Sequence, residues 1–276
     1  MYRIEGHDIN SSGWDYTSAS SFVTISFWIK SSVAQTFYLR FRMTGSSVVK
    51  EYVSAINATT SWQKITKTIP GGTGVDSVNT TAEGGFIQIS LFRGTDQTGS
   101  MTIDQWNTHD SSTKVPDMTS TWYTTNDATL EITGVQLEVG SVATPYEHKK
   151  RSQELADRMR YYQIVIQSGG GGGGNTGGLG GTPYTNGSSV YCPYRFPVEM
   201  RAEPSVESTS GTGSGSGTFR TRFGNNYNFN NFSGFNDANN TSGTFITNGN
   251  AGGGDVGQYI WIETNAGAKL ALDAEL

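Results

Sequence analysis

Cysteine is nearly absent from this sequence. Its 276 residues include one cysteine, Cys192, so the chain forms no internal disulfide and builds no zinc site from cysteine ligands. The flanking Tyr191 and Pro193 do not resemble the surroundings of a nucleophile. We therefore interpret Cys192 as a small buried apolar residue, and we expect neither a metal ion nor any other cofactor.

Charge is sparse and slightly acidic. Charged residues make up 16% of the chain, and the formal net charge is −5 at pH 7. The longest basic cluster, residues 148–151, is too short to neutralise a row of phosphates, and we interpret it as a solvated linker. We predict that nucleic acid is not a partner.

Long apolar runs are missing as well. No stretch reaches the roughly 18 apolar residues that cross a bilayer, so we expect no membrane insertion. The N-terminus has no basic segment followed by an apolar one, and we expect no signal peptide. These absences favour synthesis in the cytoplasm without secretion.

In the first half of the chain, apolar and polar residues alternate. The alternation is clear at residues 23–30, 37–43 and 87–91, and shorter runs lie at 48–56 and 62–69. Clusters of Gly, Ser, Asn and Pro separate these runs and indicate turns. Many short strands at this spacing predict an all-β sandwich or jelly roll.

The last strand of this half changes phase. Leu130 and Ile132 share one parity, whereas Val135, Leu137 and Val139 share the other. The change falls at Gly134, and a glycine at a phase change is typical of a β-bulge.

One helix is predicted at residues 151–162. Its apolar stripe consists of Leu155, Met159 and Tyr162. Glu154 and Arg158 are spaced for an ion pair, and Ser152 is a candidate N-cap. A helix this short is marginal alone. We expect it to pack either on its own sandwich or on copies of itself in a trimer.

The second half differs in composition. Residues 168–182 are dominated by glycine and form either a flexible linker or a loop of an ordered oligomer. Residues 183–276 are rich in Gly, Asn, Ser and Thr, and strands are expected at 190–194, 205–208, 218–223, 259–262 and 270–272. Aliphatic residues are few, so we expect a small β-domain that gains burial by oligomerisation.

Catalytic arrangements find little support. A glycosidase needs two carboxylates about 5 Å or about 6.5–9.5 Å apart. The candidate pairs are Asp104 with Asp110 and Glu131 with Glu138, but strand parity gives neither pair a reason to converge. The sequence also has no Gly-x-Ser-x-Gly elbow between a strand and a helix. We predict no catalytic residues; the alternative is a polysaccharide-degrading enzyme.

Two segments combine aromatic and amide or acidic side chains, as sugar sites do. The first contains the candidates Trp106, Asn107, Asp110, Trp122 and Tyr123, and the second contains Tyr227, Phe229 and Phe232. The alternative for the first is that its rings simply cover the sandwich. The alternative for the second is packing along a trimer axis.

One junction resembles a known family. Residues 133–148, TGVQLEVGSVATPYEH, lead directly into a helical segment that ends with RYYQ at 160–163. This resembles many phage tail-fibre and virion-surface proteins, in which a carbohydrate-binding-module-like jelly roll continues through a bridging helix into a C-terminal β-domain. Weaker similarity occurs at residues 3–6, 23–31 and 196–206.

The resemblance implies a domain order and a function. It implies a jelly-roll-like sandwich at 1–148, shortened or completed by a partner chain, a bridging helix and strand at 149–167, a linker at 168–182 and a β tip domain at 183–276. It also implies a homotrimer on the exterior of the virion that contacts other virion proteins and binds host-surface polysaccharide without catalysis. The alternative is a capsid decoration or fibre-anchoring protein that does not contact the receptor.

Overall fold

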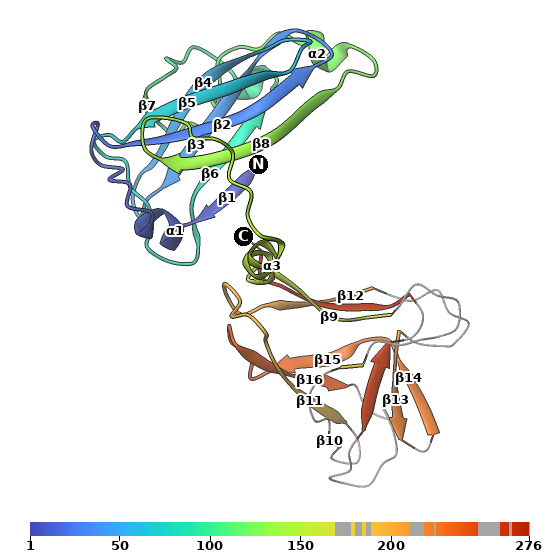
Figure 1. Cartoon of the computed structure of the whole chain (residues 1–276). Coiled ribbons are helices and arrows are strands. Elements are labelled where there is room, and N and C mark those ends of the chain that lie inside the picture. The colour runs from blue at the N-terminus through green and yellow to red at the C-terminus, as the bar shows by residue number, and fades with distance from the viewer. Residues whose placement is uncertain are drawn as a thin grey trace. The chain divides into compact units, whose positions relative to one another are not determined.

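The computed structural model describes residues 1–168, 178–179, 184–185, 189–209, 218–223, 225–247, 260–264 and 267–275, with backbone alone at 184–185, 222–223 and 225–227. The chain divides into two compact units, which we call unit 1 (Met1–His148) and unit 2 (Lys149–Glu275) (Figure 1). All strand pairs between named strands in both units are antiparallel. The expectation of an all-β protein is confirmed at this level.

Unit 1 contains two sheets. The five-stranded sheet consists, in spatial order, of β1 (Tyr2–Glu5), β6 (Glu83–Ser90), β3 (Gln35–Thr44), β4 (Val49–Ala58) and β7 (Trp106–Thr108). The three-stranded sheet consists of β5 (Gln63–Pro70), β2 (Phe22–Ser31) and β8 (Leu130–Val139). The strands predicted in the first half are therefore confirmed, whereas β1 and β7 were not anticipated.

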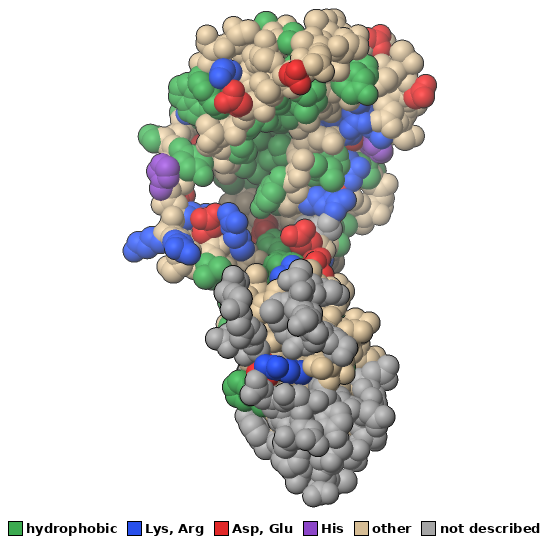
Figure 2. Space-filling model, turned by 90° about the vertical axis from the view of Figure 1, so that its right-hand side faces the viewer, with side chains coloured by type: hydrophobic (Ala, Val, Ile, Leu, Met, Phe, Trp, Pro, Cys, Tyr) green, Lys and Arg blue, Asp and Glu red, His purple; other side chains and the backbone are tan. Residues whose placement is uncertain are grey.

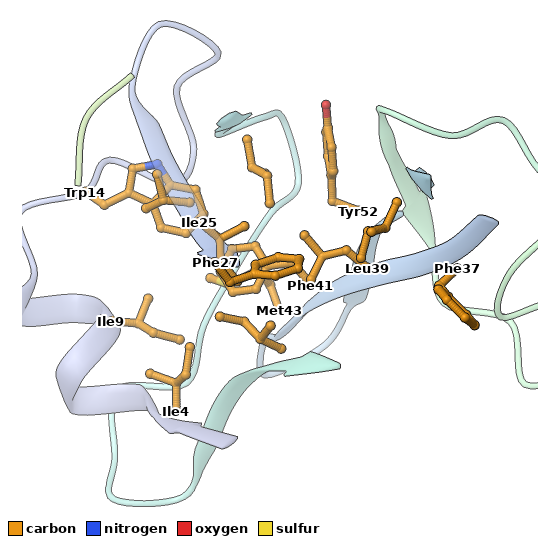
Figure 3. Packing of buried hydrophobic residues seen from close by; sticks show 14 of the residues in the cluster. Ile4, Ile9, Trp14, Ile25, Phe27, Phe37, Leu39, Phe41, Met43 and Tyr52 are labelled. Carbon is orange, nitrogen blue, oxygen red and sulfur yellow. The ribbon is translucent and has the colours of Figure 1, made fainter. Parts of the chain in front are cut away.

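One hydrophobic cluster joins the two sheets. Alternate residues of β2, including Phe27 and Ile29, and alternate residues of β3, including Phe37 and Leu39, are almost completely buried in it. Figure 3 shows Phe27 of β2 next to Phe41 and Met43 of β3, and Trp14 of the loop before β2 stacks on Phe41. Because both sheets contribute their inner rows to one core, unit 1 is a sandwich.

The predicted bulge is present in β8. Gly134 has φ +60°, and the pairing of β2 with β8 shifts between Ser26 and Trp28. Two β8 residues therefore oppose the single residue Phe27. Glycine reaches this left-handed conformation without the penalty of a Cβ, which explains the phase change in the sequence.

The helices differ from the prediction of a single helix. Unit 1 has α1 (Gly6–Ser11), α2 (Thr121–Thr124) and a 3₁₀ turn at Thr95–Gln97. The expected helix is α3 (Arg151–Met159), and its Glu154–Arg158 ion pair is confirmed. Lys150, not Ser152, is the N-cap residue. Tyr162 lies outside the helix because it begins β9 (Tyr162–Gln167).

Unit 2 contains three sheets within the described residues. The first consists of β12 (Ser205–Thr209), β18 (Lys269–Asp273) and β9; the second of β10 (Tyr184–Thr185), β11 (Val190–Arg195), β16 (Ser242–Thr247) and β15 (Phe232–Asn236); the third of β14 (Asn225–Phe229), β13 (Phe219–Phe223) and β17 (Trp261–Thr264). The strand expected at 149–167 thus pairs inside unit 2, whereas the linker predicted at 168–182 falls largely outside the described residues.

Unit 2 has a hydrophobic core within one chain. Phe219, Phe245, Ile262 and Leu270 are fully buried in it. Cys192 is also fully buried, as predicted, and burial raises the pKa of its thiol to about 12. Unit 2 therefore does not need a second copy to bury its apolar residues. An argument for a trimer has to rest on residues outside this core.

Candidate functional site

The first predicted aromatic candidate, Trp106, faces the core of unit 1. Its ring packs edge-on against Tyr52 at a centroid distance of 5.5 Å and against Phe41 at 6.0 Å. Its indole Nε1 donates a hydrogen bond of 2.7 Å to the carbonyl oxygen of Pro70. These contacts connect β7 to β5, so Trp106 acts as a core residue that joins the two sheets.

Trp122 is held in a similar way at the end of the sandwich. Its ring lies edge-on to Phe37 at a centroid distance of 5.8 Å. Nε1 donates to the carbonyl oxygen of Thr129 at 3.2 Å, and the backbone N–H donates to Gln35 Oε1 at 2.8 Å. The ring is packed against the core cluster, so little of it faces a ligand.

Asn107 and Asp110 are held by local hydrogen bonds. Asn107 donates to the carbonyl oxygen of Thr102 at 2.9 Å. The Asp110 carboxylate accepts hydrogen bonds from the hydroxyl and the backbone N–H of Ser112, which lower the pKa of the carboxyl group below its usual range. Both residues therefore order the loop in which they lie.

Tyr123 differs from these residues. It is 65% exposed, and its ring stacks on Phe92 with a centroid distance of 4.6 Å and an interplanar angle of 9°. The support from Phe92 leaves the other side of the Tyr123 ring as a flat surface. Among the predicted aromatic candidates of unit 1, Tyr123 alone presents its ring to solvent in this way.

The candidates of unit 2 form part of its aromatic core. Phe232 packs on Phe219 at a centroid distance of 5.1 Å and on Phe245 at 5.2 Å, and Phe229 packs edge-on against Phe232. The Tyr227 side chain lies outside the described residues. The packing of these phenylalanines is within one chain, so their rings are explained without a ligand or a second copy.

The predicted oligomer stripe is divided between two elements. Leu155 is exposed on α3, and Met159 at its last turn is half-buried. Tyr162 in β9 donates a hydrogen bond of 2.6 Å to Glu207 and accepts one of 2.5 Å from Lys269. Tyr162 is therefore fixed within unit 2, and the part of the stripe that lies on α3 consists of exposed Leu155 and half-buried Met159.

Exposed aromatic rings gather on a surface that the sequence analysis did not select. The outer side of the three-stranded sheet carries Trp28 in β2, which is 44% exposed, and Trp62 just before β5, which is 43% exposed. Tyr146, after β8, is also exposed. We call this surface the aromatic face, and define it by Trp28, Trp62 and Tyr146.

The bulge places two of these rings together. A Cβ at Gly134 would lie 3.5 Å from Cδ1 of Trp28 and 3.9 Å from Cδ2 of Tyr146. Both rings therefore lie against the bulged backbone of β8. The bulge predicted from the sequence thus shapes the aromatic face.

Polar side chains border the rings. Lys30 lies 5.9 Å from the ring centroid of Trp62 and forms an ion pair of 2.8 Å with Glu131. Gln136 accepts a hydrogen bond of 2.7 Å from the backbone N–H of Glu147. The aromatic face therefore combines flat apolar rings with charged and amide groups at their edges.

Glu138 fixes the segment that carries Tyr146. Its carboxylate accepts hydrogen bonds from the hydroxyl and backbone N–H of Thr144. The Thr144 hydroxyl is the main cause of a lowered pKa of this carboxyl group, followed by the Gln136 amide and then by the Thr144 N–H. Together with the Gln136 bond to Glu147, these hydrogen bonds hold residues 144–147 across β8. Tyr146 is thereby positioned rather than left on a free tail.

A signal for Trp28 was present in the sequence. Trp28 stands on the polar row of a strand whose other members are Thr24, Ser26 and Lys30. A large aromatic residue in such a row is expected to face solvent, which is an unusual place for it. The register confirms this position, because Trp28 pairs with Lys64 while its neighbour Phe27 enters the core.

The opposite sheet carries a buried ion pair on its outer side. Arg40 donates a hydrogen bond of 2.5 Å to Glu51, and both side chains are nearly inaccessible. Nδ1 of His109 lies 2.8 Å from the same carboxylate oxygen, although the angle does not make a hydrogen bond. Arg40 also donates to Gln88, which accepts from Arg93. This network connects Arg93, in the loop after β6, and His109, directly after β7, to the five-stranded sheet.

Comparison with protein-family models and with curated proteins gives no match for this sequence. Within the ranges described above, no cluster of three or more His, Cys, Asp or Glu residues is placed to hold a metal ion. No helix among the same residues has the length and apolar character needed to cross a membrane. The aromatic face and the Tyr123–Phe92 stack are therefore the features from which a function can be argued.

Proposed function

We propose that this protein is a structural protein of a bacteriophage fibre or spike, which binds host-surface glycans without catalysis on the exterior of the virion. The aromatic face supports the binding part of this proposal. Two exposed indoles on one sheet surface, with Lys30 and Gln136 beside them, suit a ligand with flat apolar faces and hydroxyl edges. Sugar rings have this character, and their hydroxyl groups accept and donate hydrogen bonds.

The position of the rings favours an extended glycan over a small molecule. Trp28 and Trp62 lie on an open sheet surface, and each leaves more than two-fifths of its area to solvent. A small ligand is usually enclosed in a concave pocket. Several sugar units of one polysaccharide, by contrast, can contact separate rings. Because these units are covalently linked, the weak contacts at each ring together raise the affinity.

The finer architecture belongs to the same proposal. We infer that unit 1 is a jelly-roll-like carbohydrate-binding module, that α3 bridges to a C-terminal tip domain, and that the protein is a homotrimer. None of the α3 residues is buried in the single chain, and Leu155 is 55% exposed. A helix of about three turns is marginal in water without packing, so copies of α3 packed through Leu155 and Met159 would stabilise it.

The experiment is inhibition of phage adsorption to host cells by the purified full chain. Wild-type protein should block attachment in a dose-dependent manner. Trp28→Ala and Trp62→Ala should each raise the concentration needed by about tenfold, equivalent to about 1.4 kcal/mol. Trp106→Phe is the matched control, because this ring faces the core. Tyr123→Ala tests whether the Tyr123–Phe92 stack adds to the site.

A second function has a specific observation in its favour. An apolar row consisting of Val135, Leu137 and Val139 is exposed on β8 at one edge of the sandwich, and such a row suits protein contacts. A capsid decoration or fibre-anchoring protein would use that edge and leave host cells unbound. If well-folded wild-type protein fails to block adsorption at any concentration, this second function replaces the first.

A further inference from the structure

Most of the inner row of β8 is exposed although it faces the core side of its sheet; Leu130, at the start of the strand, packs against the core. Val139 and Leu137 pair with Val23 and Ile25 of β2, which are almost completely buried. The β8 residues of this row, by contrast, are 39–53% exposed: Ile132, Val135, Leu137 and Val139. These four apolar side chains on β8 are thus not covered by the opposite sheet, whereas the corresponding side chains on β2 are buried in the core.

The two sheets have unequal widths at this side of the sandwich. The hydrogen bond from Trp106 in β7 to Pro70 at the end of β5 places β5 near the β4–β7 side. The order β5-β2-β8 then places β8 toward β6 and β1. Five strands face three, so the three-stranded sheet ends before it covers the other sheet.

The opposing edge, β1, is exposed at its first residue, Tyr2, whereas Ile4 of the same row is buried in the core. Tyr2 of β1 pairs with Ile87 of β6, which pairs with the core residue Phe41. Tyr2 therefore lies on the inner row, yet it is 67% exposed. Figure 2 shows hydrophobic side chains lining a hollow on one side of unit 1. In the part of the chain that the structure describes, β8 pairs with β2 alone.

The backbone and the charges of β8 indicate what fits there. An edge strand offers unpaired N–H and C=O groups, which a further strand can pair with. β8 carries Glu131 and Glu138 and no Lys or Arg. If two copies of β8 paired antiparallel over their full length, Glu131 would face Glu138, and like charges directly opposite destabilise a sheet. A second copy is therefore disfavoured.

We propose that β8 accepts an extended strand from a different protein chain, which lengthens the three-stranded sheet and closes the sandwich. The incoming strand has apolar residues at every second position, which cover Val135, Leu137 and Val139 from the side. Its other row carries Lys or Arg, complementary to Glu131 and Glu138. The apolar row of this site lies on the inner side of the sheet, whereas the aromatic face, bordered by Glu131 and Glu138, lies on the outer side.

The test is binding of a labelled probe peptide to the full chain by fluorescence anisotropy. The probe has about eight residues in which Val and Lys alternate, the length of a typical strand. A peptide of the same composition with its Val residues grouped together is the first control. The alternating peptide with methylated backbone nitrogens at every second residue is the second control, because it lacks the ladder donors.

The alternating peptide should bind at least about tenfold more tightly than either control. The double variant Val135→Lys, Leu137→Lys should weaken its binding by a similar factor. Thr66→Lys, Thr68→Lys on exposed positions of β5 is the matched control and should leave binding unchanged. Thermal melting of both double variants shows that any loss is not a loss of fold.

Three results would overturn the proposal. One is equal binding of the alternating and grouped peptides, which would show mere adhesion of apolar side chains. Another is unchanged binding in the β8 double variant. The third is a wild-type dimer that the β8 double variant converts to a monomer, because the occupant would then be a second copy of this chain.

Discussion

Tryptophan occurs both inside the sandwich of unit 1 and on the outer side of its three-stranded sheet, and the two regions hold it differently. Inside, the indole N–H groups of Trp14, Trp106 and Trp122 donate to carbonyl oxygens of Ser21, Pro70 and Thr129. Outside, Trp28 and Trp62 leave large parts of their rings to solvent. A buried indole usually finds a partner within the protein, whereas an exposed ring keeps its surface for a ligand.

The difference shows that the row of a strand, more than the residue type, decides the role of an aromatic side chain. Phe27 and Trp28 are neighbours in β2, yet one is fully buried and the other is 44% exposed. Trp106 and Trp122 were selected from the sequence because they are tryptophans near polar residues. Trp106 lies on the core side of β7 and Trp122 packs from α2 against Phe37, so both hold structural positions, while the row of Trp28 places it in a position to bind.

The largest expected effect contrasts these two neighbours. Phe27→Ala removes a fully buried ring from the core and should lower the free energy of unfolding of unit 1 by about 3–5 kcal/mol. Trp28→Ala should change it by less than about 1 kcal/mol, because its ring packs on one side only. Urea unfolding followed by circular dichroism measures both. Similar losses in the two variants would mean that Trp28 belongs to the core.

A smaller effect is expected at Trp106. Trp106→Phe keeps most of the ring but leaves the Pro70 carbonyl oxygen without the indole N–H, which should cost about 1–3 kcal/mol of stability. Binding to host cells should not change, because the ring faces inward. Unfolding and adsorption are measured on the same preparation. A loss of binding with unchanged stability would move Trp106 into the binding site.

The smallest effect is expected at Glu138, which holds the Tyr146 segment on the outer side. Its pKa is lowered in the folded protein by the Thr144 hydroxyl, so the carboxylate stabilises the fold above its ordinary pKa. This stabilisation is lost as the pH falls through the lowered value. Glu138→Gln should therefore cost a few tenths of a kcal/mol at pH 7 and nothing in strong acid.

Thermal melting from neutral to acidic pH follows this difference. The wild-type and Glu138→Gln curves should converge as the carboxyl group becomes protonated. A difference that stays constant across the pH range would assign the effect to the change of side chain and not to its charge.

The sequence predicted much of unit 1 because its strands alternate in the ordinary way. The run at 23–30 became β2, and the phase change at Gly134 became a bulge. In unit 2, β14 and β15 were missed because they are rich in Asn and Gly, which have low strand propensity. Pairing with β13 and β16 forms these strands despite their composition.

The site was harder to predict than the fold. Trp28 was visible as an aromatic residue on a polar row, but its exposure depends on what lies beside β2 in the sheet. Trp62 only begins the run at 62–69 and Tyr146 follows β8, and they join Trp28 only through pairing between distant segments. The exposed inner row of β8 required the register with β2, since its apolar alternation alone predicts burial.

The central claim is that the aromatic face binds host glycan, and NMR of the tryptophan indole N–H groups tests it most directly. Spectra of ¹⁵N-labelled full chain are recorded during titration with purified host-surface polysaccharide, and single Trp→Phe variants assign each signal. The signals of Trp28 and Trp62 should shift, while those of Trp14 and Trp106 stay in place. Shifts confined to the buried tryptophans, or none at saturating polysaccharide, would contradict the account.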